Sequence, residues 1–187
     1  WFGSNSGNLF QCGYQGARAD LRYVSPGTAS TYKNLGGGQT YVEENNEAIP
    51  SHQRLADFIY FINKASDADF RSGLGNWLNV DGFLRTMAAD VVVGQWDGIW
   101  FGANNYHLYD NPVTGRFEYM PYDYDNTIGI DFFNIDWAKR PLENWAAGGF
   151  GWNPDAPPLP RRVMENPVWN RQFRRYMQKK YLGLLLS

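Results

Sequence analysis

The chain has 187 residues, a length that suits one domain with a buried core. Charged residues make up 19% and aromatic residues 17% of it, which excludes a disordered tail, and its net charge of −2 gives no broad electrostatic footprint for nucleic acid. No apolar run approaches the roughly 20 residues that cross a bilayer, and the single Cys12 excludes an internal disulfide or a multi-cysteine metal site.

The first 47 residues are rich in Gly, Ser, Asn and Thr. Short β-like pieces are predicted at Ala19–Val24 and Gln39–Val42. Three consecutive glycines at 36–38 lack the spacing of the known phosphate-binding loops, and no helix follows them at once. They therefore predict a flexible turn.

Two helices follow, and each is marked by apolar residues at helical spacing. Ser51 is expected to be the N-cap of the first. The second starts near Asn79 and places Asp97 just beyond its C-terminal end. Asp90 falls on the apolar side of this second helix and is interpreted as a polar satellite of the core. The apolar positions are Leu55, Phe58, Ile59 and Ile62 in the first helix, and Phe83, Leu84, Met87, Ala88, Val91 and Val92 in the second.

A β-hairpin is predicted next. Tyr106–Asp110 and Arg116–Tyr122 read as strands, and Asn111–Gly115 joins them with Asn-Pro and Thr-Gly turn chemistry. The hairpin should fold its two ends back towards each other. Groups far apart in sequence would then share one site.

Polar side chains stand at both ends of this hairpin. Asp97 and Asn105 precede it, and Asp123 and Asp125 follow it. Carboxylate, amide, hairpin, carboxylate is the order of parts in a protein-kinase catalytic segment. A calcium loop starting at Asp123 is disfavoured, because its sixth and twelfth positions hold Ile and Asn instead of Gly and Glu.

The last third of the chain contains a long segment, Asp131–Ala156, with three tryptophans and repeated Gly and Pro. It is interpreted either as a substrate or partner contact or as a lid packed over the core. Asn166 and Pro167 should cap the final helix. The basic residues of that helix are interpreted as a solvated face: Arg171, Arg174, Arg175, Lys179 and Lys180.

The phrase LYDNPVTGRFEYMPYDYDNTIG, preceded by QWDG, strongly resembles the CotH family of atypical, often secreted kinases related to spore-coat proteins. Gly7–Phe10, Tyr41–Glu47 and Leu159–Tyr181 resemble further family segments less strongly. The resemblance covers most of the chain and is most specific between Asp81 and Gly129.

This resemblance implies an α+β, atypical protein-kinase-like fold: mainly the helical C-terminal lobe, the catalytic hairpin and a partial β-containing N-terminal lobe. Residues 1–187 would form one domain truncated at its N-terminus, with 1–50 a remnant of the N-lobe and 51–187 the catalytic lobe. We expect the isolated chain to bind metal weakly and ATP poorly.

The implied function is transfer of the ATP γ-phosphoryl group to Ser or Thr of a protein substrate, with Mg²⁺ or Mn²⁺. Asp97 would orient the attacking hydroxyl or accept its proton. Asp123 would be the principal metal ligand, assisted by Asn105, with Asp125 secondary. Both Asn105 and Asp123 would thereby contact the ATP cofactor. The location would be secreted or at a cell or spore surface, and neither nucleic acid nor a transmembrane segment is expected.

Two alternatives stay open: a pseudokinase-like surface or coat binding protein, and a metal-dependent phosphate-ester hydrolase. Three departures from the kinase or family pattern bear on them. Asp97 and Asn105 are eight positions apart instead of five, which leaves Asn104 as a rival metal ligand. Tyr122 stands where the family usually has Trp, and Gln11 where it would have Lys.

Overall fold

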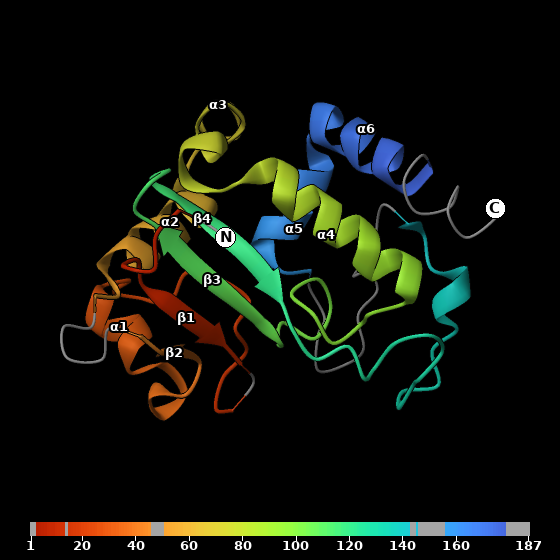
Figure 1. Cartoon of the computed structure of the whole chain (residues 1–187), viewed down its shortest axis with the longest axis horizontal. Coiled ribbons are helices and arrows are strands. Elements are labelled where there is room, and N and C mark those ends of the chain that lie inside the picture. Colours follow the sequence, from red (N-terminus) through yellow and green to blue (C-terminus); the bar gives the residue numbers. More distant parts are fainter. Residues whose placement is uncertain (1–2, 14, 46–50, 143–144, 146–155, 179–187) are drawn as a thin grey trace.

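The computed structural model describes residues 3–13, 15–45, 51–142, 145 and 156–178. Helices and one antiparallel sheet alternate along this part of the chain, which confirms the α+β class (Figure 1). The elements are β1 (Leu9–Cys12), α1 (Ala29–Lys33), η1 (Leu35–Gly38), β2 (Tyr41–Glu43), α2 (Gln53–Lys64), α3 (Asp67–Trp77), α4 (Val80–Val93), β3 (Tyr106–Asn111), β4 (Arg116–Pro121), η2 (Trp137–Lys139), α5 (Pro158–Glu165) and α6 (Pro167–Tyr176).

The four described strands are ordered β2-β1-β3-β4. Phe10 on β1 lies opposite Glu43 on one side and Leu108 on the other, and Leu108 lies opposite Tyr119. Phe10 and Leu108 are fully buried and so anchor the centre of the sheet in the core. The predicted hairpin is confirmed as β3 and β4, and strands from both sides of residue 50 share this sheet.

Helix α4 carries the chain to the site. The helix begins where the sequence predicted it, and Asn79 caps its start by accepting a hydrogen bond from the Gly82 N–H at 3.1 Å. Gly94 ends it in the left-handed conformation at φ 69°, a geometry that glycine adopts without steric penalty. The helix packs against β4 and α6 (Figure 1), and at its C-terminal end the Val93 carbonyl accepts a hydrogen bond from the Ile128 N–H.

Two local predictions are wrong. The N-cap of helix α2 is His52 and not Ser51. The Ser51 N–H donates to the Glu43 carboxylate at 3.0 Å, and this bond holds Ser51 at β2. Residues 19–24 form no strand. Leu21 has φ 56°, and its N–H donates to the Tyr41 hydroxyl at 3.0 Å instead of joining a ladder.

The other local predictions agree with the structure where it describes them. β2 overlaps the second β-like piece at Tyr41 and Val42, and the three glycines lie in a tight turn, η1. Asn166 caps α6 by accepting from the N–H groups of Val168 and Trp169, and Arg171, Arg174 and Arg175 are exposed. Trp137 and Trp145 are buried. Trp152, Lys179 and Lys180 lie outside the described residues.

Candidate functional site

The loop after α4 accommodates the long spacing between Asp97 and Asn105. Two backbone hydrogen bonds close it, from the Gly102 N–H to the Trp96 carbonyl at 2.9 Å and from the Ala103 N–H to the Gly98 carbonyl at 2.8 Å. A Cβ atom at Gly102 would lie 2.5 Å from Asp97 Oδ1, so the loop can fold this tightly only with glycine there. The extra residues are thus taken up in a compact loop, and the two ends meet.

Asp97 is the centre of a cluster of side-chain amides. Its Oδ2 accepts hydrogen bonds from Asn105 Nδ2 at 2.9 Å and from Asn126 Nδ2 at 3.3 Å. Asn104 Nδ2 is 3.5 Å from both carboxylate oxygens. The structure therefore places Asn105 closest to Asp97, with its amide oxygen left as a ligand atom. Asn126 is a further member of the cluster that local sequence patterns did not predict.

Burial of Asp97 raises the pKa of its carboxyl group, the amides of Asn104 and Asn126 lower it by hydrogen bonding, and the charges of Asp125 and Asp123 raise it again; the net shift is upward. The charges of Asp123 and Asp125 therefore act on the Asp97 carboxyl group. A cation bound among them would relieve their mutual repulsion.

Asp123 and Asp125 follow the end of β4 and are both exposed. Asp123 has φ 57° and Asn105 has φ 54°, and the Tyr122 N–H donates to the Asn105 carbonyl at 3.0 Å. Left-handed backbone at residues other than glycine is uncommon and clusters at functional sites. Here the two residues with left-handed backbone lie at the two ends of the hairpin, Asn105 just before β3 and Asp123 just after β4.

The donor set fits a hard divalent cation. Among the described residues no side chain or N–H donates a hydrogen bond to the carboxylate of Asp123 or of Asp125. Oxygen ligands suit Mg²⁺, which keeps several waters and takes few protein groups. Within the described ranges no three His, Cys, Asp or Glu side chains are grouped as a metal site. The Asn105 amide, water and phosphate oxygens would therefore have to complete the ligand shell.

Asp90 lies on the buried side of α4, as its position in the sequence suggested, and it also binds the turn that carries Asp123 and Asp125. It is buried at 2% exposure, but its Oδ1 accepts a 2.7 Å hydrogen bond from the hydroxyl of Tyr124, the residue between Asp123 and Asp125. Burial raises the pKa of Asp90 from 3.8 to about 7, and the Tyr124 hydrogen bond opposes the shift.

This raised pKa predicts a pH-dependent stability. Because the folded state holds a proton on Asp90 more tightly than the unfolded state, the stability it contributes is full below pH 4 and is lost as pH rises through about 7. Asp90→Asn keeps an acceptor for Tyr124 and removes the titration. The unfolding free energy of the variant relative to wild type should therefore rise between pH 5 and pH 8 by roughly 3 kcal/mol, the part of a shift of this size that falls between these two pH values. Urea titrations at both pH values measure it, and a constant difference would contradict it.

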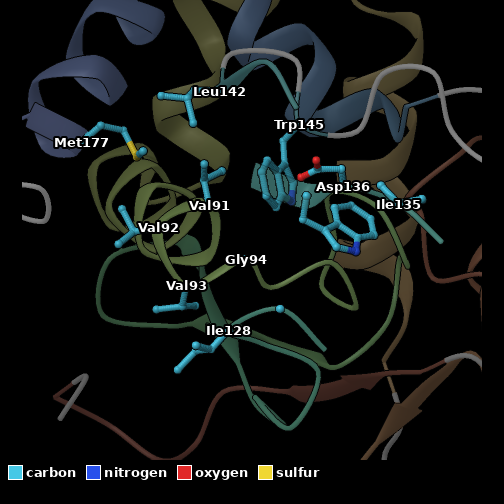
Figure 2. A pocket seen from close by; sticks show the side chains of 12 residues that line it. Val91, Val92, Val93, Gly94, Ile128, Ile135, Asp136, Leu142, Trp145 and Met177 are labelled. Atoms are coloured by element: carbon cyan, nitrogen blue, oxygen red, sulfur yellow. The ribbon is translucent and has the colours of Figure 1, made fainter. Parts of the chain in front are cut away.

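A cavity of about 450 Å³ lies at the C-terminal end of α4. The C-terminal end of α4 and the residues around Ile128, Trp137 and Trp145 line it, and Figure 2 shows Val91, Ile135 and Trp145 around it. Among the described residues that line it, Asp136 alone is charged, and Asp136 pairs with Lys139 at 2.7 Å. An apolar cavity with an acidic edge does not suit a triphosphate, so we place the candidate site at Asp97 and Asp123 and not here.

Side chains of β1 and β3 lie near Tyr122, at the end of β4. Gln11 lies opposite His107 in the ladder and its side chain is near the Tyr122 hydroxyl, and the ring centroids of His107 and Tyr122 are 4.7 Å apart. Gln11, which stands where the family's phrase has lysine, thus lies near Tyr122, the residue that precedes Asp123. His107 also approaches Glu44 at 3.4 Å.

The described part of the chain thus has an α+β architecture with an aspartate–asparagine cluster beside its β3–β4 hairpin. The family model described as CotH kinase protein matches residues 2–185. The chain belongs to the CotH family.

Curated relatives support the assignment. Over 130 residues, 70% of this chain, it is 30% identical to the inner spore coat protein H of Bacillus subtilis. It is 27% identical over 112 residues to the spore coat protein homolog 1 of Rhizopus delemar, and 26% identical over 120 residues to the invasin CotH7 of the same fungus. The two fungal matches cover 56% and 60% of this chain, respectively. The chain spans only part of its relatives' length: 33% of the Bacillus protein, 17% of the spore coat protein homolog 1 and 18% of the invasin CotH7. Among the described helices none is long and apolar enough to span a membrane.

Proposed function

We propose that this chain carries the catalytic site of a metal-dependent protein kinase that transfers the γ-phosphoryl group of ATP to Ser or Thr of a protein. The observation that carries the proposal is the 2.9 Å contact between Asp97 and Asn105. This contact joins the two ends of the loop after α4, and the Tyr122 N–H, next to Asp123, donates to the Asn105 carbonyl. Family membership supports the same reading.

Each residue has a role that follows from its surroundings. Asp97 is half-buried, and its raised pKa suits a group that orients a hydroxyl and takes its proton. Asp123, exposed at the end of the hairpin, would hold Mg²⁺ or Mn²⁺ together with the Asn105 oxygen, with Asp125 as the secondary ligand. These residues would thereby place a positive charge beside the ATP phosphates, and this charge would neutralise the negative charge that develops during transfer. Asn104 and Asn126 hold the Asp97 carboxylate in place.

Binding of nucleotide is the first test. ATP with Mg²⁺ or Mn²⁺ should raise the melting temperature of the wild-type protein, since a ligand that binds only the folded state stabilises it. ATP without metal should raise it far less, and Asp123→Ala should remove most of the effect. The measurement is best made on the 187-residue chain and on the longest natural chain that contains it. An equal shift in wild type and Asp123→Ala would argue against a metal-nucleotide site at Asp123.

Two other functions use the same surface. A pseudokinase-like coat or surface binding protein is favoured by Gln11, because an amide there cannot supply the charge of a lysine. A phosphate-ester hydrolase would use the same carboxylates with water as acceptor. Labelling of a protein from ATP separates the kinase from both, and phosphate release without labelling would favour the hydrolase. The names of the relatives favour a coat or surface location.

A further inference from the structure

Gln95 connects the two halves of the candidate site. It is the first residue after Gly94 and is buried at 2% exposure. Its Nε2 donates to the Asp123 carbonyl at 2.8 Å, and its Oε1 accepts from the Asp97 N–H at 3.1 Å. One side-chain amide therefore binds the backbone of both aspartates, which lie 26 positions apart in sequence.

A second tether acts on the next residue of the turn. The Tyr124 hydroxyl donates to Asp90 at 2.7 Å, and the Ile128 N–H donates to the Val93 carbonyl at 2.7 Å. Asp90 and Val93 belong to α4. The turn that bears Asp123 and Asp125 is thus attached to the same helix end that delivers Asp97.

These tethers matter because the Asp123 side chain has no hydrogen bond from the described residues to fix it. Its place depends on its backbone, which is held at φ 57°, a conformation that residues other than glycine rarely adopt unless the surroundings enforce it. The Gln95 amide bonds directly to that residue's carbonyl. Loss of the bond would let the turn relax and move the carboxylate away from Asp97.

We propose that Gln95 is a positioning residue: its amide sets the distance and orientation between Asp97 and Asp123, and the Tyr124–Asp90 hydrogen bond holds the same turn from its other side. The inference rests on the proposed function for the identity of the site. It adds a residue that acts through its neighbours and touches neither metal nor nucleotide.

Gln95→Met tests it, because methionine keeps the size and removes both hydrogen bonds. Loss of a group that orients a ligand typically weakens metal affinity by about 10–100-fold, so the Mn²⁺ dissociation constant of Gln95→Met should rise by about this factor. Tyr124→Phe should produce a smaller rise. Asn63→Leu is the matched control, since Asn63 Nδ2 also binds two backbone carbonyls, of Leu21 and Ile59, away from the site. It should leave the Mn²⁺ dissociation constant unchanged.

Hydrogen exchange of the amides of Tyr122 and Ile128 gives a reading independent of activity. These amides are bonded across the junction, to the carbonyls of Asn105 and Val93. Their exchange should accelerate at least about 10-fold in Gln95→Met and stay unchanged in Asn63→Leu. Unchanged exchange in Gln95→Met would overturn the inference, as would faster exchange with unaltered Mn²⁺ affinity. A wild-type protein that binds no Mn²⁺ would instead contradict the proposed function, and with it the positioning role, whatever the exchange shows.

Discussion

Asp97→Asn should abolish phosphoryl transfer while leaving the melting temperature within a few degrees of wild type. Groups that orient an acceptor or take its proton typically contribute about 10²–10⁴-fold to the rate. The fold should tolerate the change, because asparagine keeps one oxygen for the Asn105 amide and removes a half-buried charge that Asp123 and Asp125 disfavour. Initial rates of phosphate transfer at saturating ATP measure the effect.

The control for Asp97 is Asp57→Asn on α2, which makes the same change of charge at an exposed position. It should transfer phosphate at the wild-type rate. Near-normal activity of Asp97→Asn would remove Asp97 from the mechanism. A large fall in melting temperature would show that its bonds to the three asparagines serve folding first.

Metal binding should depend much more on Asp123 than on Asp125. Asp123 leaves the hairpin directly beside Asn105, and its backbone is bonded by Gln95. Asp123→Ala should weaken Mn²⁺ binding by at least about 10-fold, on the scale of lost metal-site groups, and Asp125→Ala by much less. Titration with Mn²⁺ followed by electron paramagnetic resonance compares the two.

The backbone of Asp123 requires a second variant. Alanine is poorly suited to φ 57°, whereas asparagine tolerates the left-handed region. Asp123→Asn should therefore lose metal affinity with less loss of stability than Asp123→Ala. If Asp125→Ala proved the more damaging change, the assignment of the two aspartates would be reversed.

The sequence predicted the parts of this site that local pattern determines. Helix α4 has apolar residues at regular spacing and an Asn cap, and the hairpin has strong turn residues, so the positions of Asp97 and Asp123 relative to these elements were predictable. Helix α3 was not predicted, because its 11 residues include two glycines and bury only Phe70 and Leu74.

The connections between distant segments could not be read in the same way. Asn126 reaches Asp97, Gln95 reaches Asp123 and Tyr124 reaches Asp90 across 28 to 34 positions. Each contact depends on how the loop and the turn pack, which periodicity does not encode. Asp90 was interpreted as a polar satellite of the core because helical spacing reports burial but not the hydrogen-bond partner.

The central claim is that Asp97 and Asp123 form one phosphoryl-transfer site, and transfer of labelled phosphate tests it most directly. The longest natural chain that contains this site, incubated with Mn²⁺ and ATP labelled at the γ-phosphate, should place label on Ser or Thr of itself or of acceptor peptides. Asp97→Asn and Asp123→Asn should transfer none, and Asp57→Asn should match wild type. Labelling that persists in either site variant, or free phosphate without labelled protein from the wild type, would contradict the account.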